Sequence, residues 1–161
     1  MTNIANEFSS FAKMPSANEQ QLNLIEILET TIDLYKKEQV EIKFENHCEK
    51  EALLFADKDQ LNRLFSNLIK NAIQAIPESQ KAKIEVAASC KKNNYIITIT
   101  DNGGGIPKEL QEKIFTPNFT TKTTGMGLGL AMVKNIVENL NGTIDFTTSN
   151  KGTMFKIEIP C

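Results

Sequence analysis

The sequence is poor in cysteine, in net charge and in long apolar runs. Its three cysteines, at positions 48, 90 and 161, are odd in number and form no Cys-x-x-Cys pair or Cys/His cluster. Neither a disulfide framework nor a zinc site is therefore predicted, and a reducing cytoplasm fits this cysteine usage best.

A net charge of −2 over 161 residues gives no general basic field. Long-range attraction to nucleic acid or to an anionic membrane is not indicated, so any phosphate site must be local. No apolar run approaches the roughly 20 residues of a membrane span, and the start MTNIANEFSS lacks a signal-peptide pattern. We expect a soluble, cytoplasmic chain with no nucleic-acid partner, no membrane contact and one hydrophobic core.

Apolar periodicity divides the chain into helices and strands that do not alternate strictly. Helices are predicted over residues 4–14, 19–39, 58–76 and 130–140, and strands over 40–46, 52–56, 83–89, 94–101, 142–148 and 152–160. Asp57 and Gln60 suggest a capping box at the start of the third helix, and residues 102–128 form a long irregular stretch. This order favours an α+β two-layer sandwich, with helices covering one face of a mixed sheet.

The helix predicted over residues 58–76 has two different faces. Its apolar residues fall on one side: Leu61, Leu64, Phe65, Leu68, Ala72 and Ile76. Asn67, Lys70, Asn71 and Gln74 share the opposite arc, where a solvated face is the ordinary alternative. Asparagine is a mediocre helix former, so two of them one turn apart suggest directed amide oxygens, which suit Mg²⁺ when a nucleotide supplies negative charge.

Six of the eight glycines lie in two groups, Gly103, Gly104 and Gly105, then Gly125, Gly127 and Gly129. The second group leads into a predicted helix, whose free N–H groups and dipole favour an anion. Lys122 in FTTKTTG adds a positive charge for a terminal phosphate, although a lone loop lysine is commonly just solvated. The spacing matches neither a Walker loop nor a dinucleotide fingerprint.

Asp101 closes the strand YIITITD directly before the first glycine group. An ionised carboxylate only accepts hydrogen bonds, which suits the amino group of adenine and disfavours the oxygen of guanine. A strand-end aspartate that caps a turn is the structural alternative. The glycines that follow favour close approach of the backbone to a flat ligand.

Four ordered motifs carry a family resemblance: NLIKNAIQAI, DNGGGIP, IFTPNFTTK and GMGLGLAMV. They resemble the N, G1, F and G2 boxes of the catalytic ATP-binding domain of sensor histidine kinases, and KGTMFKIEIP resembles the closing G3 strand. The resemblance covers nearly all of residues 20–160. It implies the Bergerat α/β sandwich, with ATP and Mg²⁺ held between the N-box helix and a flexible lid.

The resemblance also implies roles for individual residues. Asn71 would ligate Mg²⁺ with Asn67 beside it, both counted with Lys122 as catalytic, and Asp101 would read adenine. The remaining positions implied to contact the nucleotide or to shape its lid are Lys70, Gly103, Gly105, Ile106, Phe115, Phe119, Thr120, Thr121, Lys122, Gly125, Gly127, Leu128, Gly129 and Thr153. Gly104 stands at a variable position of the motif, so its role stays open.

The sequence departs from the family pattern at two points. Gln74 stands where many members carry lysine, so Lys70 or Lys122 would supply that charge. The only histidine, His47, lies between predicted strands without an H-box, which makes it a surface residue. Residues 1–15 look like the end of a second dimerisation helix, and residues 16–161 like the catalytic domain, a monomeric fragment of a dimeric parent protein.

The implied activity is transfer of the γ-phosphate of ATP to a histidine on the absent dimerisation domain, from which a response regulator would take it. An inner-membrane anchor in the parent protein is left open. Two alternatives remain at this point: a stand-alone Bergerat serine kinase of the anti-sigma type, and an ATP-binding interaction module that transfers no phosphate.

Overall fold

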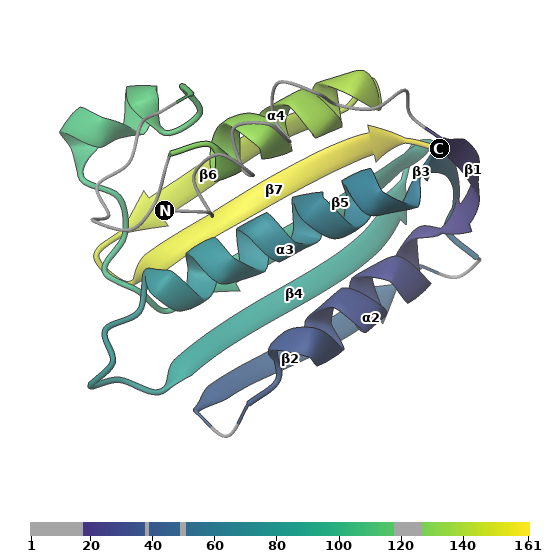
Figure 1. Ribbon diagram of the computed structural model, residues 1–161. Helices are drawn as coiled ribbons and strands as arrows, with labels where there is room; N and C mark the ends of the chain where they lie inside the picture. The colour runs from purple at the N-terminus through teal and green to yellow at the C-terminus, as the bar shows by residue number, and fades with distance from the viewer. Residues whose placement is uncertain (1–17, 38, 49–50, 118–126) are drawn as a thin grey trace, which may run out of the picture.

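The computed structural model describes residues 18–37, 39–48, 51–117 and 127–161, and these form two layers (Figure 1). One layer is a five-stranded sheet with the order β2-β4-β5-β7-β6. Its strands are β2 (Val40–His47), β4 (Ala82–Lys91), β5 (Asn94–Asp101), β6 (Thr143–Ser149) and β7 (Gly152–Pro160). The pair β2 and β4 is parallel, and the other neighbours are antiparallel. The mixed, mostly antiparallel sheet predicted from the sequence is confirmed.

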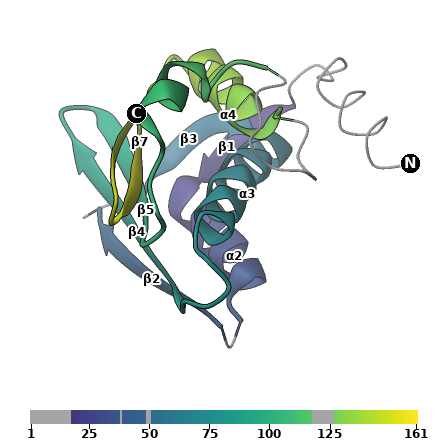
Figure 2. The same cartoon turned by 90° about the vertical axis from the view of Figure 1, so that its left-hand side faces the viewer.

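Three helices make up the second layer: α2 (Leu24–Tyr35), α3 (Lys58–Gln74) and α4 (Gly129–Asn139). They lie together on one face of the sheet (Figure 2). The six apolar positions predicted to share one side of α3 are all buried, with exposed fractions from 0% to 8%. The opposite, polar arc of α3 is thereby fixed in direction, because the apolar side is packed against the sheet.

The start of α3 is fixed by its cap. Asp57 Oδ1 accepts hydrogen bonds from the backbone N–H groups of Asp59 at 2.8 Å and Gln60 at 3.0 Å. The backbone N–H of Gln60 is the main cause that lowers the pKa of Asp57, because it stabilises the ionised carboxylate. The helix ends at Gln74, two residues before the predicted end at residue 76 and shortly before Pro77.

The single helix predicted over residues 19–39 is wrong at both ends, because α2 covers only Leu24–Tyr35. Residues Glu19–Asn23 form strand β1, which pairs antiparallel with β3 (Leu53–Asp57) in a separate two-stranded sheet. Asn23 then caps α2, because its Oδ1 accepts from the N–H of Ile25 at 3.1 Å. The partner strand lies about thirty positions further along the chain, so periodicity within the segment could not reveal it.

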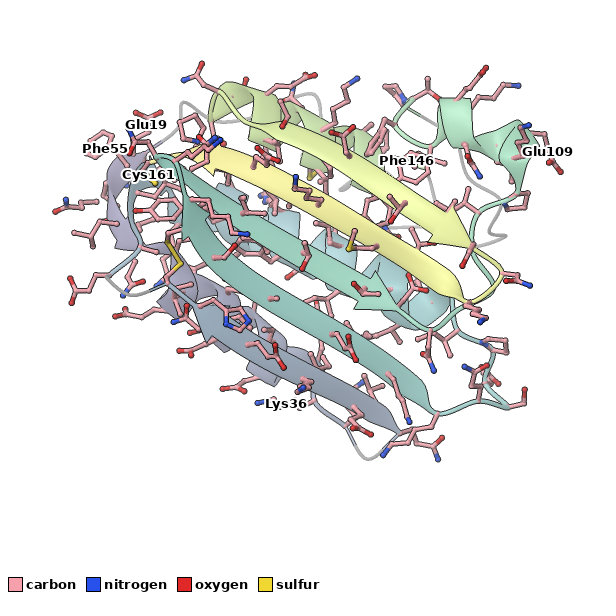
Figure 3. All side chains as sticks on the ribbon, turned by 180° about the vertical axis from the view of Figure 1, so that it is seen from behind. Glu19, Lys36, Phe55, Glu109, Phe146 and Cys161 are labelled. Carbon is pink, nitrogen blue, oxygen red and sulfur yellow. A yellow bond between two sulfur atoms is a disulfide. The ribbon has the colours of Figure 1, made fainter. Side chains whose placement is uncertain are left out.

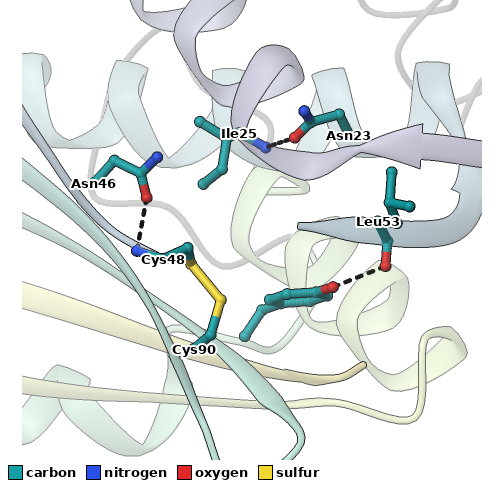
Figure 4. Close-up of a disulfide and its surroundings, with 7 residues drawn as sticks. Asn23, Ile25, Asn46, Cys48, Leu53 and Cys90 are labelled. Atoms are coloured by element: carbon teal, nitrogen blue, oxygen red, sulfur yellow. Dashed lines mark hydrogen bonds between the residues drawn. A yellow bond between two sulfur atoms is a disulfide. The ribbon is translucent and has the colours of Figure 1, made fainter. Parts of the chain in front are cut away.

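The expectation that the cysteines form no disulfide is also wrong. Cys48 and Cys90 form a disulfide, with their Cα atoms 5.2 Å apart (Figure 4). The parallel register sets His47 opposite Ser89, which makes the two cysteines the next facing pair. Their separation of 42 positions hides this pairing in the sequence. Cys161 is a free, exposed cysteine.

The other face of the sheet carries charged and polar side chains (Figure 3). Lys81 Nζ lies 2.9 Å from Glu41 Oε2, and Lys43 pairs with Glu45. His47 is the last residue of β2, one position beyond the strand predicted over 40–46, and it is exposed at the surface as predicted; its ring contacts Glu45 at 3.3 Å. Among the described helices, none combines the length and apolar character needed to cross a bilayer.

Candidate functional site

Asp101 ends the central strand β5 and is only 5% exposed. Its Oδ1 accepts hydrogen bonds from the backbone N–H groups of Gly103 at 2.8 Å and Thr153 at 3.3 Å. Within the described part of the chain, no donor reaches Oδ2. Burial raises the pKa of Asp101, and the two N–H groups partly oppose that rise. One carboxylate oxygen is thus held by the backbone, and the other remains an acceptor for a ligand.

The glycine segment after Asp101 fits into a narrow space. A Cβ at Gly103 would lie 2.5 Å from the carbonyl oxygen of Ala75, at the end of α3. A Cβ at Gly105, where φ is +78°, would lie 1.9 Å from the carbonyl oxygen of Ser149. A Cβ at Gly104 would meet nothing within 4 Å. The surrounding backbone therefore leaves no room for a side chain at Gly103 or Gly105, but it would accept one at Gly104.

Two threonine hydroxyls lie behind this segment. Thr153 is 3% exposed, and its Oγ1 lies 3.0 Å from Oγ1 of Thr148. Thr148 Oγ1 also accepts the backbone N–H of Ile106 at 2.9 Å. Thr148 was not predicted as a site residue. The register of the β6–β7 hairpin, which sets Thr148 opposite Thr153, is the signal that could have found it.

The asparagines of α3 lie beside the start of α4. Asn67 Nδ2 donates to the carbonyl oxygen of Arg63 at 2.8 Å and contacts Met132 Sδ at 3.9 Å. Its Oδ1 points toward Gly129, since a Cβ built there would lie 3.0 Å from it. Asn71 follows one turn later on the same arc and is, like Asn67, partly exposed. Lys70 and Gln74 flank them and are exposed.

The start of α4 offers backbone donors. Gly127 has φ of +68°, and Leu128, 5% exposed, precedes the first helical residue. No side chain of the described residues caps this end. The first N–H groups and the positive end of the helix dipole therefore favour an anion next to Asn67.

Phe115, which follows the glycine segment in the chain, packs into an aromatic cluster. Its ring packs edge-on against Phe146 at 6.1 Å and Phe155 at 6.4 Å between centroids. The ammonium of Lys134 lies 6.0 Å from the Phe115 centroid. Ile106 is partly buried and packs against the core. This cluster fixes the position from which the chain continues toward residue 118.

The structure thus brings the predicted residues together in two groups. The first surrounds Asp101 with Gly103, Gly105, Ile106 and Thr153. In the second, Asn67 lies against Gly129 at the start of α4, with Asn71 one turn further along α3. Phe119, Thr120, Thr121, Lys122 and Gly125 lie outside the described residues, so their roles stay predictions, as does the assignment of residues 1–15.

The side chains near α3 could hold a cation only together with negatively charged groups of a bound ligand. In the chain as described, no group of three His, Cys, Asp or Glu side chains could hold a metal ion. The polar arc of α3 carries the amide groups of Asn67 and Asn71, whose oxygens are uncharged metal ligands. A divalent cation at this place would need phosphate oxygens as its charged ligands.

Comparison with known proteins agrees with this arrangement. Residues 56–161 match the family of histidine kinase-, DNA gyrase B- and HSP90-like ATPases. A putative sensor histidine kinase, NtrY-like, from Rickettsia conorii is 35% identical over 145 residues, which are 89% of this chain and 24% of that protein. The chain therefore spans about a quarter of the length of that relative.

Two solved structures share the fold. The catalytic domain of histidine kinase ThkA has a TM-score of 0.76 and 32% identity, covering 89% of this chain and 95% of that one. Histidine kinase ThkA in complex with the response regulator protein TrrA has a TM-score of 0.78 and 27% identity, covering 98% of this chain and 46% of that one. The chain belongs to the family of histidine kinase-, DNA gyrase B- and HSP90-like ATPases and has the nucleotide-binding fold of a sensor histidine kinase catalytic domain.

Proposed function

We propose that this chain holds Mg·ATP between α3 and the start of α4 and donates the γ-phosphoryl group to a histidine on a dimerisation domain of its parent protein. A response regulator would then take the phosphoryl group. The observation that carries the proposal is that both groups lie along α3, one at its C-terminal end and the other at its middle. Gly103 packs against the end of α3, and Gly129 packs against Asn67 in its middle.

The base would bind at the Asp101 end. Oδ2 would accept from the amino group of adenine, while Oδ1 stays bonded to the N–H groups of Gly103 and Thr153. Guanine would present an oxygen to the same carboxylate, so adenine is favoured. The glycine segment would let the flat ring approach the backbone.

The triphosphate would lie toward the other group. The N–H groups at the start of α4 would bind phosphate oxygens, and Asn71, with Asn67 beside it, would offer amide oxygens to the cation. Mg²⁺ would neutralise charge that develops on the phosphate oxygens during transfer. Lys122, which lies outside the described residues, would add a further positive charge.

The acceptor histidine would come from another domain. His47 is paired with Glu45, a neighbour on the face of β2 turned away from the helices, so it faces away from α3. In the transfer, the bond from the γ-phosphorus to the bridging oxygen breaks, and a bond to an imidazole nitrogen forms, which leaves ADP. An amide cannot accept a proton at neutral pH, so Asn67 would not activate water, and ATP hydrolysis would be slow.

The test mixes this chain with radiolabelled Mg·ATP and the dimerisation domain of its parent protein. We expect label on the acceptor domain that is lost in acid and stable in base, the behaviour of a phosphohistidine. The matched control carries glutamine in place of the acceptor histidine. Saturating Mg·ATP binding without label on the unchanged acceptor domain would overturn the kinase proposal and leave only nucleotide binding.

A further inference from the structure

Thr148 stands at the junction of three segments that surround Asp101. Its Oγ1 accepts the N–H of Ile106 at 2.9 Å, lies 3.0 Å from Thr153 Oγ1, and lies 3.5 Å from the carbonyl oxygen of Gly152. Thr148 therefore contacts both the glycine segment and the buried hydroxyl beside the carboxylate. No role follows for it from the sequence motifs.

Counting protons leaves two arrangements of these hydrogen bonds. A threonine hydroxyl has one proton to donate and two lone pairs that accept. The 3.0 Å contact to Thr153 is of normal length, whereas the 3.5 Å contact to Gly152 is at the outer limit. In the first arrangement, Thr148 accepts from Ile106 and donates to Thr153; in the second, Thr153 donates to Thr148, which donates to Gly152. The first arrangement does not depend on the 3.5 Å contact, and it leaves the proton of Thr153 for another acceptor.

In the first arrangement, the proton of Thr153 needs another acceptor, because a buried hydroxyl without one is costly. The backbone N–H of the same residue donates to Asp101 Oδ1, so the residue lies directly beside the carboxylate. A donor beside an acceptor matches adenine, whose amino group lies next to ring nitrogens that accept. Along the Watson–Crick edge guanine presents a carbonyl oxygen and an N–H, which reverses both groups, whereas along the other edge its carbonyl oxygen and ring nitrogen both accept.

We propose that Thr148 is a positioning residue that holds the Thr153 hydroxyl as a donor toward a ring nitrogen of adenine, directly or through one water. The order of donation is Ile106 N–H to Thr148, Thr148 to Thr153, and Thr153 to the base. This inference rests on the proposed adenine site at Asp101. It adds a residue that does not itself touch the nucleotide and that orients the Thr153 hydroxyl, whose contact with the nucleotide the family resemblance already implies.

The test measures binding of ADP and of its 1-deaza and 7-deaza analogues, each lacking one ring nitrogen, by titration calorimetry. Thr148→Val keeps the branched shape and removes the hydroxyl. We expect it to weaken ADP binding roughly tenfold, the size of one hydrogen bond of about 1.4 kcal/mol. Thr148→Ser should restore the affinity of the unchanged chain. Thr147→Val, at the exposed neighbour on the opposite face of β6, is the matched control and should have no effect.

The analogues distinguish base recognition from general support of the loop. In the unchanged chain, one analogue should bind more weakly than ADP, and Thr148→Val should remove that difference. Equal weakening of all three ligands would overturn the proposal, because it would show a merely structural role. So would unchanged ADP binding by Thr148→Val, or equal binding of the three ligands by the unchanged chain.

Two further measurements separate other causes of failure. Thermal unfolding followed by circular dichroism reports whether Thr148→Val folds, and Thr148→Ala is measured in parallel with the same expected loss of discrimination. Absence of ADP binding by the unchanged, folded chain would overturn the adenine site itself together with this inference. If the unchanged chain binds ADP, the results for the Thr148 variants test only the role of Thr148 and leave the adenine site in place.

Discussion

The two ends of the candidate site are built in different ways. The base end is made of strand ends and a tight turn, with Asp101, Thr148 and Thr153 joined by hydrogen bonds and Gly105 pressed against Ser149. The phosphate end is made of the polar arc of α3 and the start of α4, where partly exposed amides lie beside uncapped N–H groups. The hydrogen bonds of the base end are largely formed without a ligand. The phosphate end depends on the negative charges of a ligand to complete a cation site.

This difference between the two ends indicates that the base end determines which nucleotide binds and the phosphate end determines how binding depends on the metal. Groups held by the sheet cannot adjust, so the base end should discriminate sharply between ligands and tolerate few substitutions. The phosphate end has neutral oxygens and backbone donors that act on any polyphosphate carrying a divalent cation. Changes at the base end should therefore alter which nucleotide binds, and changes at the phosphate end should alter how binding depends on the metal.

The largest expected effect comes from a substitution that introduces a steric clash at the base end. In Gly105→Ala, the new Cβ would meet the Ser149 carbonyl oxygen at 1.9 Å in a residue with φ of +78°. We expect the free energy of unfolding to fall by about 2–4 kcal/mol, as for other backbone-strain substitutions, with ADP binding abolished. Denaturant unfolding and titration calorimetry measure the two quantities. Gly104→Ala is the control, because its Cβ meets nothing within 4 Å, and its values should match those of the unchanged chain. Equal losses at both positions would contradict the steric account.

The next largest effect is expected when the ligand-facing acceptor of Asp101 is replaced by a hydrogen-bond donor. In Asp101→Asn, the amide oxygen must accept the N–H groups of Gly103 and Thr153, which turns the amide NH₂ toward the base. A donor then faces the amino group of adenine, and ADP affinity should fall roughly a hundredfold, the size expected for a hydrogen bond to a charged group. Inosine diphosphate, which has an oxygen at that position, should gain relative to ADP. An unchanged preference for ADP would show that Asp101 does not read the base.

A smaller and metal-dependent effect is expected at the phosphate end. Asn71→Ala should weaken ATP binding in the presence of Mg²⁺ roughly tenfold, since it removes one neutral oxygen ligand. Binding with the cation chelated should change little. The control Lys58→Ala lies on the same helix at its distant first turn and should leave both conditions unchanged. The same loss with and without Mg²⁺ would show that Asn71 does not act through the metal.

The smallest effect is a pair of opposite pH trends. Burial raises the pKa of folded Asp101 above its ordinary value, so the folded chain binds the proton more tightly than the unfolded chain. The contribution of Asp101 to stability is therefore greatest below the ordinary pKa and falls as pH rises through the raised one. ADP binding needs the ionised carboxylate and should rise over the same window. Unfolding and titration series across the acidic range measure both trends, and Asp101→Asn should remove the part due to this group. Parallel trends would contradict the assignment.

The sequence predicts local features of this molecule well and cross-strand features poorly. The faces of α3 and α4 and the strands β4, β5 and β7 follow from periodicity, because burial repeats with the period of each element. The motif order also points to Asp101 and to the steric difference between Gly105 and its neighbour. Strand β1, by contrast, forms because five mostly polar residues pair with β3, a partner that no local pattern reveals.

Thr148 and the cysteine pair illustrate the same limit. Thr148 matters because the hairpin register sets it opposite Thr153, and Cys48 meets Cys90 because β2 and β4 are parallel neighbours in register. Each depends on an alignment between two strands, which is decided by tertiary packing. Motif matching finds residues that touch a ligand, and it passes over those that hold them in place.

The Cys48–Cys90 disulfide has a consequence for the covalent connectivity of the chain. The crossover between the parallel strands β2 and β4 contains β3 and all of α3, so the disulfide encloses the asparagine-bearing helix in a closed ring. A single protease cut anywhere inside that ring would leave one covalent molecule, with β2 and β4 still joined. In its oxidised form, the chain can thus be opened next to its nucleotide site without being divided into two pieces.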